Sequence, residues 1–222
     1  MTGGRQSDYA LSVRGCGLDL VPQPSSPHGL PFAGVDFRFR GGTTIEDDAV
    51  LAVTYGSNLH SDVVVQSTGY LGLYGAITGE ATNHGNMWLD GMVIGNVVND
   101  GVLMPASSIW SEGSGHWVHV DGAFSQSPAS TLDAVMGATF GGFVSVTGRA
   151  DIDGTLRLVN YSDDWGPYPL PAVPFTVHVL HVDGGVYGRF SNLASPGLVV
   201  TGNPRYLAND IFFDVTGISA AK

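Results

Sequence analysis

The stretch GYLGLYGAITG, Gly69–Gly79, and the stretch GNMWLDGMVIG, Gly85–Gly95, carry one pattern at a spacing of 16 residues. The pattern alternates apolar residues with others and places glycine at its corners. A third copy begins at Gly101. Shifting the frame by one residue gives a fourth copy, with these residues at the matching positions: Val118, Val120, Gly122 and Phe124. Aligned copies of so short a pattern indicate a repeat architecture.

The pattern predicts short strands that stack coil upon coil. Alternation with a period of two is typical of a strand with one buried face, and glycine lets the chain bend where a Cβ atom would clash. The repeat is shorter than a βαβ unit and has no helical period inside it. It therefore favours a solenoid in which each coil buries its apolar face against its neighbours. We predict an all-β, single-stranded parallel β-helix; a β-sandwich with accidental regularity is the alternative.

Two turns repeat in step with the apolar pattern. Asn83-His84-Gly85 and Asn99-Asp100-Gly101 lie 16 residues apart. Asn or Asp before glycine suits positive φ angles, so we expect tight turns of that kind at both places. The recurrence strengthens the solenoid prediction.

Composition limits the function classes. The chain has 222 residues, 32 of them glycine, a formal charge of −11 and only 9 basic residues. Phosphate contacts need a basic surface, so this charge argues against a nucleic-acid partner. No window is long and apolar enough for a transmembrane segment. Cys16 is the single cysteine, which excludes a disulfide framework and a cysteine metal site. We predict no cofactor.

Proline content and the pattern of apolar residues and glycines divide the chain into three regions. Residues 1–44 form an N-terminal segment, a cap or leader with a proline-rich loop, because proline removes ladder donors. Residues 45–115 hold the β-helix rungs. Residues 116–222 hold further alternating segments with glycine corners, and a longer loop with four prolines, Tyr161–Pro174, interrupts them.

Two pairs of histidines have a spacing used by metal sites. His116 and His119, and likewise His178 and His181, are three residues apart. That spacing suits a helix, whereas residues three apart in a regular strand point to opposite faces. We therefore expect neither pair to share a metal ion and predict no metal site.

Acidic residues offer two further candidate sites. Asp151 and Asp153 lie on one face of a strand, as acid/base pairs or calcium sites require, but a solvated outer face is the favoured interpretation. The long loop presents Asp163, Asp164 and Trp165, where a sugar could stack on the indole ring, and loops carry function more often than rungs. We treat these three residues as a candidate glycan contact.

Enzymatic function has little support in the sequence. A polysaccharide-cleaving β-helix would need clustered carboxylates and a basic residue across adjacent coils, and basic residues are few. No Gly-x-Ser-x-Gly motif is present, and Cys16 has no recognisable partner. We predict a non-enzymatic protein.

The second half of the chain resembles the autochaperone segment of type Va autotransporter passengers, the part that precedes the outer-membrane barrel. The matching pieces occur in the family's order. They are Gly122–Gln126 with Ser130–Leu132, Val144–Gly148 with Ala150–Leu156, Phe175–Leu180 with Gly184–Phe190, and Arg205-Tyr206 with Asn209–Ile211. The rungs upstream resemble the glycine-rich repeats of self-associating autotransporter adhesins.

The resemblance implies a right-handed β-helix with a C-terminal capping subdomain. It implies a secreted or bacterial surface location, and as partners the protein's own β-barrel translocator and upstream passenger. The implied role is a non-enzymatic stem whose C-terminal part nucleates folding during outer-membrane translocation. An adhesin that binds glycans, a host surface or like molecules is the alternative.

A nucleus of this kind would rest on apolar ladders, because ordering a first coil is the costly step and a preformed coil is a template for the next. The residues expected to carry it are Trp117, Val118, Val120, Phe124, Leu132, Val144, Val146, Ile152, Leu156 and Leu158, with Phe190 and Tyr206 closing the end.

Overall fold

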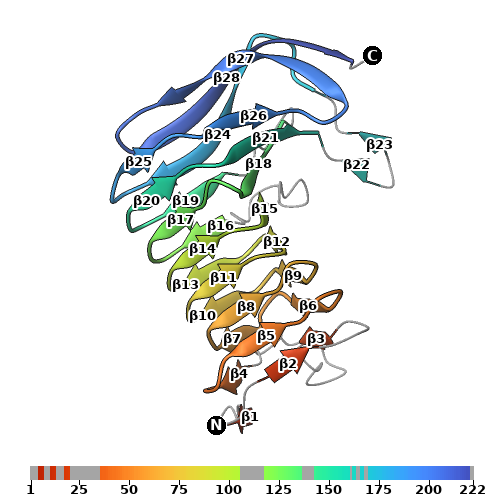
Figure 1. Cartoon of the computed structure of the whole chain (residues 1–222), viewed down its shortest axis with the longest axis vertical. Helices are drawn as coiled ribbons and strands as arrows, with labels where there is room; N and C mark the ends of the chain where they lie inside the picture. Colours follow the sequence, from red (N-terminus) through yellow and green to blue (C-terminus); the bar gives the residue numbers. More distant parts are fainter. Residues whose placement is uncertain are drawn as a thin grey trace, which may run out of the picture.

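The computed structural model describes residues 5–7, 11–13, 18–20, 36–105, 118–136, 143–160, 162–163, 166–167 and 170–220. Within these residues every regular element is a β-strand, and three long sheets run side by side up a stack of coils (Figure 1). Each coil contributes one strand to each sheet, and strands of neighbouring coils pair in parallel. The chain is a parallel β-helix, as the sequence predicts.

The strands divide among the sheets as follows. The first sheet contains, in spatial order, β1 (Arg5–Ser7), β4 (Asp36–Phe39), β7 (Asn58–His60), β10 (Ala76–Thr78), β13 (Met92–Ile94), β16 (Val118–Val120), β19 (Val144–Val146), β24 (Phe175–Val182), β28 (Asp210–Ala220) and β27 (Leu198–Tyr206). The second contains β2 (Leu11–Val13), β5 (Thr43–Ile45), β8 (Val63–Val65), β11 (Ala81–Asn83), β14 (Val97–Asn99), β17 (Phe124–Gln126), β20 (Ala150–Ile152) and β25 (Val186–Gly188). The third contains β3 (Leu18–Leu20), β6 (Val50–Val53), β9 (Tyr70–Leu73), β12 (Asn86–Leu89), β15 (Val102–Pro105), β18 (Thr131–Val135), β21 (Thr155–Val159) and β26 (Asn192–Ala194). A small hairpin, β22 (Ser162–Asp163) with β23 (Gly166–Pro167), stands apart.

The register of the third sheet reproduces the 16-residue spacing. Leu71 of β9 pairs with Met87 of β12, which pairs with Leu103 of β15, and all three side chains are buried. The first three copies of the pattern are therefore three successive coils. The spacing predicted the register because a fixed repeat brings equivalent residues onto the same side of the tube.

The fourth copy lies on a different side of the coil. The sequence match would place Phe124 in the row of Val93, but the structure pairs Phe124 with Val97 and sets Val120 beside Val93. Val118 thus begins a strand of the first sheet rather than the third. Apolar alternation is the same on all three sides, so it does not reveal which side a strand occupies.

The repeated turns contain glycine for a reason other than the expected one. Neither Gly85 nor Gly101 is among the residues with positive φ, so the predicted left-handed turn is wrong at both. A Cβ atom on Gly101 would lie 2.2 Å from the carbonyl oxygen of Gly85 in the coil below. Glycine is required because successive coils approach each other too closely for any side chain at this corner.

Apolar side chains fill the inside of the tube in continuous rows. In the first sheet one row runs along the axis through Ile77, Val93, Val120, Val146 and Val182, each with 0% of its surface exposed. Burying one such side chain is worth about 1.5–3 kcal/mol. Because each member contacts its neighbours above and below, stability depends on adjacent coils being present together.

Antiparallel strands close the C-terminal end. The last three residues of β24 pair in parallel with β19, and the same strand also pairs antiparallel with β28, which pairs antiparallel with β27. Figure 1 shows β27 and β28 arching over the last coil. We call β24, β27 and β28 the C-terminal cap.

Candidate functional site: a histidine–aspartate cluster in the C-terminal cap

A β-bulge in β24 brings two histidines to the same face of the sheet. His178 pairs with Phe212, but the register then shifts so that Leu180 pairs with Ile211 and His181 with Asp210. Two consecutive residues, Val179 and Leu180, are buried between the histidines. A bulge adds one residue to one strand and so restores side chains three apart to one face.

The bulge overturns the expectation for this histidine pair. His178 and His181 do not point to opposite faces; both rings reach the same oxygen, Oδ1 of Asp210. The sequence holds a signal for this, because Val177-His178-Val179-Leu180-His181-Val182 breaks strict alternation with two adjacent apolar residues. Of the other predicted pair, His119 lies in β16, and His116 lies outside the described residues.

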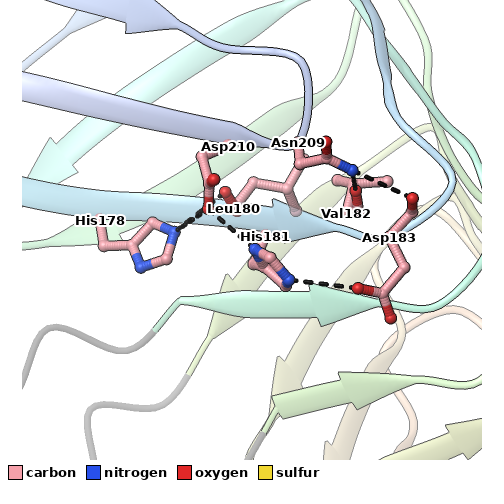
Figure 2. Close-up of polar contacts among 7 residues, drawn as sticks. All are labelled: His178, Leu180, His181, Val182, Asp183, Asn209 and Asp210. Atoms are coloured by element: carbon pink, nitrogen blue, oxygen red, sulfur yellow. Dashed lines mark hydrogen bonds and ion pairs between the residues drawn. The ribbon is translucent and has the colours of Figure 1, made fainter.

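The three polar side chains form a tight cluster (Figure 2). His178 Nε2 lies 3.0 Å from Asp210 Oδ1, and His181 Nδ1 lies 2.8 Å from the same oxygen. One potential ligand atom from each residue falls within 4.8 Å of the others. His178 Nε2 also lies 3.2 Å from the Leu180 carbonyl oxygen. A fourth side chain extends the cluster, because Asp183 Oδ1 lies 3.3 Å from His181 Nε2.

Neighbouring groups fix the orientation of the cluster. The imidazole of His178 is stacked between two phenyl rings, with its centroid 4.3 Å from that of Phe143 and 4.5 Å from that of Phe212. Asn209, immediately before Asp210, donates its Nδ2 hydrogens to the carbonyl oxygens of Val182 at 2.6 Å and Asp183 at 3.0 Å. The carboxylate is therefore presented by an anchored turn.

The carboxylates act on the protonation of His181. The hydrogen bond to Asp210 raises the pKa of His181 above its ordinary value, burial opposes this rise, and Asp183 adds a smaller rise. An imidazole that faces carboxylates on both nitrogens is stabilised as a cation. In chemical terms the cluster is a compact acceptor for positive charge, either protons or a metal ion.

The predicted ladder residues lie inside the tube. Val118, Val120, Phe124, Leu132, Val144, Val146, Ile152, Leu156 and Leu158 are all buried. Their burial accounts for stability. Their role as a folding nucleus stays a prediction, and Trp117 lies outside the described residues.

Phe190 and Tyr206 come together at the cap. The backbone N–H of Phe190 donates to the Tyr206 hydroxyl oxygen at 3.1 Å, and both side chains pack against the core. The Arg189 guanidinium lies 4.9 Å from the centroid of the Tyr206 ring. This contact joins the segment after β25 to β27.

The remaining candidates differ in outcome. Asp164 and Trp165 lie outside the described residues; of Asp163 only the backbone is described, in β22. Asp151 is exposed and bonded to the Arg149 guanidinium, with Nε at 3.0 Å, and Asp153 accepts the N–H of Gly154 at 2.7 Å. These contacts occupy both carboxylates and agree with a solvated outer face.

A tyrosine cluster on the outside of the third sheet escaped the sequence analysis. Tyr55 and Tyr74 have ring centroids 5.6 Å apart, and the Tyr55 hydroxyl donates to Asp90 Oδ2 at 2.5 Å. Burial and the hydrogen bond to Asp90 raise the pKa of Tyr55. These residues belong to three different turns or strands, so only the coiling places them together.

No protein-family model matches the chain, and no curated protein is significantly similar to it. Among the described residues there is no helix of the length and hydropathy that crossing a membrane would require.

Proposed function

We propose that this protein is a non-enzymatic β-helical stem whose C-terminal coils and cap nucleate the folding of the coils before them. In keeping with the resemblance in its second half, we place it in a secreted or surface-displayed autotransporter passenger. There it would work with an outer-membrane translocator and an upstream passenger.

The observation that carries this proposal is the covered C-terminal edge of the first sheet. A coil of a β-helix exposes unpaired N–H and C=O groups on both edges, and each edge is a template for another strand. In the first sheet β28 and β27 cover β24 on the C-terminal side. A stack that starts at this end grows toward the N-terminus, with each added coil burying the next set of apolar side chains.

Refolding kinetics of the full chain test the direction of growth. Val146 and Val93 occupy the same apolar row and are equally buried, one near the cap and one in the central coils. Each Val→Ala change removes about two buried methyl groups and is expected to destabilise by roughly 1–3 kcal/mol.

The two variants should differ in which rate they change. Val146→Ala should slow refolding, with a φ-value of about 0.5–0.8, whereas Val93→Ala should mainly speed unfolding, with a φ-value of about 0–0.3. Stopped-flow chevron plots give both values. Equal φ-values, or a higher one at Val93, would reject nucleation at the C-terminal end.

A second candidate function is glycan binding on the outer face of a rung. The tyrosine cluster of Tyr55 and Tyr74 favours it, because Tyr55 is exposed, aromatic rings can stack on a sugar, and Asp90 fixes the Tyr55 hydroxyl. A glycan array probed with the full chain and with Tyr74→Ala tests this function. Tyr187→Ala, which removes an exposed tyrosine of β25, is the control. Binding that both variants retain would reject this surface.

A further inference from the structure

We propose that His178, His181 and Asp210 bind a divalent first-row transition cation, with Zn²⁺ as the reference ion. The ligands would be His178 Nε2, His181 Nδ1 and Asp210 Oδ1, and water would complete the coordination. Two imidazole nitrogens with one carboxylate oxygen suit zinc, cobalt, nickel or copper, whereas calcium and magnesium prefer oxygen ligands alone. This inference does not depend on the nucleation proposed above.

The two nitrogen–oxygen distances are close to those of a formed site. Zinc–nitrogen and zinc–oxygen bonds of about 2.0–2.1 Å place tetrahedral ligand atoms about 3.3 Å apart. The nitrogens of His178 and His181 lie 3.0 and 2.8 Å from Asp210 Oδ1, and all three atoms lie within 4.8 Å of one another. The two nitrogens, which lie up to 4.8 Å apart, would have to approach each other by rotation of their side chains before both could bind one ion.

The hydrogen-bonding pattern around His181 points the same way. His181 presents Nδ1 to Asp210 and Nε2 to Asp183 (Figure 2). With Nε2 held by Asp183, Nδ1 is the nitrogen that a metal ion would take, and the ion would replace the hydrogen of the hydrogen bond between Nδ1 and Asp210. A carboxylate behind a ligating histidine is the usual partner of such a ring.

The site is open and yet held in place. The side chains of His178, His181 and Asp210 are 28%, 39% and 24% exposed, so an ion can reach them from solvent. The phenyl rings of Phe143 and Phe212 hold His178, and Asn209 anchors the turn that presents Asp210. Pre-oriented ligands lower the entropy cost of coordination.

Other histidine–aspartate pairs in the described coils lack a third ligand. His60 Nε2 lies 3.4 Å from Asp36 Oδ1, and His84 Nδ1 lies 3.4 Å from Asp100 Oδ2. Among the described residues, the cap cluster is the only group of three or more potential metal ligands that lie close enough together to hold an ion. The pair His84–Asp100 therefore supplies a matched control, since it has the same chemistry without the third group.

Titration of the tag-free full chain with ZnCl₂ by calorimetry tests the proposal, and visible absorption of the Co²⁺ form reports on nitrogen ligation. We expect one equivalent to bind. His181→Gln and Asp210→Asn should each weaken binding at least tenfold, and His84→Gln should leave it unchanged. Zn²⁺ at 100 times its Kd should raise Tm by roughly 5–10 °C in the parent chain relative to EDTA.

Two results would overturn the proposal: no saturable binding by the parent chain, or binding that His181→Gln and His84→Gln affect alike. If a ligand variant fails to fold by circular dichroism, Asp183→Asn replaces it. Asp183 is 65% exposed, so its loss should spare the fold and still weaken Zn²⁺ binding roughly 10–100-fold by releasing the His181 ring. Unchanged affinity in Asp183→Asn would contradict the assignment of Nδ1 as the ligand.

Discussion

The central coils and the C-terminal cap both contain a cluster of polar side chains. The cluster of the central coils lies inside the tube, whereas that of the cap lies on the outer face of the sheet. In the central coils Asn83, Asn99 and Gln126 point into the tube and are buried in line along its axis. In the cap His178, His181 and Asp210 lie on the outer face and remain partly exposed.

The three buried amide nitrogens donate to one another's oxygens or to the backbone, whereas Gln126 Oε1 accepts no hydrogen bond within the described residues. Asn83 Nδ2 donates to Asn99 Oδ1 at 2.8 Å and to the Val102 carbonyl at 3.0 Å, and Asn99 Nδ2 donates to the Thr131 carbonyl at 3.1 Å. Gln126 Nε2 donates to the Asp153 carbonyl at 2.9 Å. This amide ladder ties each coil to the next at the corner between the second and third sheets.

The contrast shows what burial permits. Uncharged amides can lie inside the tube because stacked coils repeat their partners at fixed spacing, so each amide nitrogen meets an acceptor. Ionisable side chains in the same place would lose their hydration without full compensation. The ionisable side chains of the cap cluster are partly exposed, so water, protons and ions reach them. The ladder thus serves structure, and the cap cluster is available for chemistry.

The largest effect is expected from placing a charge inside the tube. Val146→Asp or Leu156→Asp buries an unpaired carboxylate among apolar side chains and should destabilise by about 4–5 kcal/mol or more, enough to impair folding. Urea unfolding followed by circular dichroism measures the loss. Ser145→Asp, one residue along and partly exposed, is the control. An unchanged unfolding midpoint in Val146→Asp would contradict the buried row.

A smaller effect is expected from breaking the amide ladder. Asn99→Ala removes the oxygen that accepts a hydrogen bond from Asn83 Nδ2 and leaves one N–H of Asn83 buried without that acceptor. The change should lower the free energy of unfolding by about 1–3 kcal/mol. The double change Asn83→Val with Asn99→Val should destabilise by less than the sum of the two single changes. The reason is that the same row contains Val65 and Ile152 in other coils. Strict additivity of the free energies of unfolding would mean that the two amides do not interact.

In the cap, one hydrogen bond can be removed without disturbing packing. Tyr206→Phe deletes the acceptor for the Phe190 N–H and should destabilise by about 1 kcal/mol. Hydrogen exchange at the Phe190 amide should become faster, since closure of the cap depends on this contact. Tyr187→Phe, on an exposed ring, should change neither quantity. Equal protection of Phe190 in both variants would disprove the contact's role.

The smallest effect concerns an exposed ion pair at the outer end of the cap. The Arg205 guanidinium and the Thr176 hydroxyl hold the pKa of Asp214 below its usual value of 3.8. This stabilising contribution is fully present above pH 3.8 and is lost as pH falls through the lower pKa of the folded state. Asp214→Asn should therefore lower Tm slightly at pH 6, and the difference from the parent chain should shrink at the most acid pH. A difference in Tm that stays constant with pH would contradict the assignment.

The sequence predicted the repeat but not its geometry on every side. Leu71, Met87 and Leu103 fall in one row because their spacing is constant, and a constant spacing can be read directly. Phe124 was placed in the wrong row, because residues 106–117 interrupt the period and apolar alternation looks alike in all three sheets. The glycines at the corners were found, but their cause, contact with the coil below, involves residues 16 or more positions away.

The candidate site shows the same division. The residues themselves determined that two histidines occur three apart in an apolar segment near the C-terminus and that basic residues are scarce. Only the tertiary structure decided that the rings share a face and meet Asp210. That outcome required a bulge in β24 and an antiparallel partner some 30 residues further along the chain. Periodicity is a local property that can be read from the amino-acid sequence. Register between distant strands is set by how they pack, and the sequence does not show this directly.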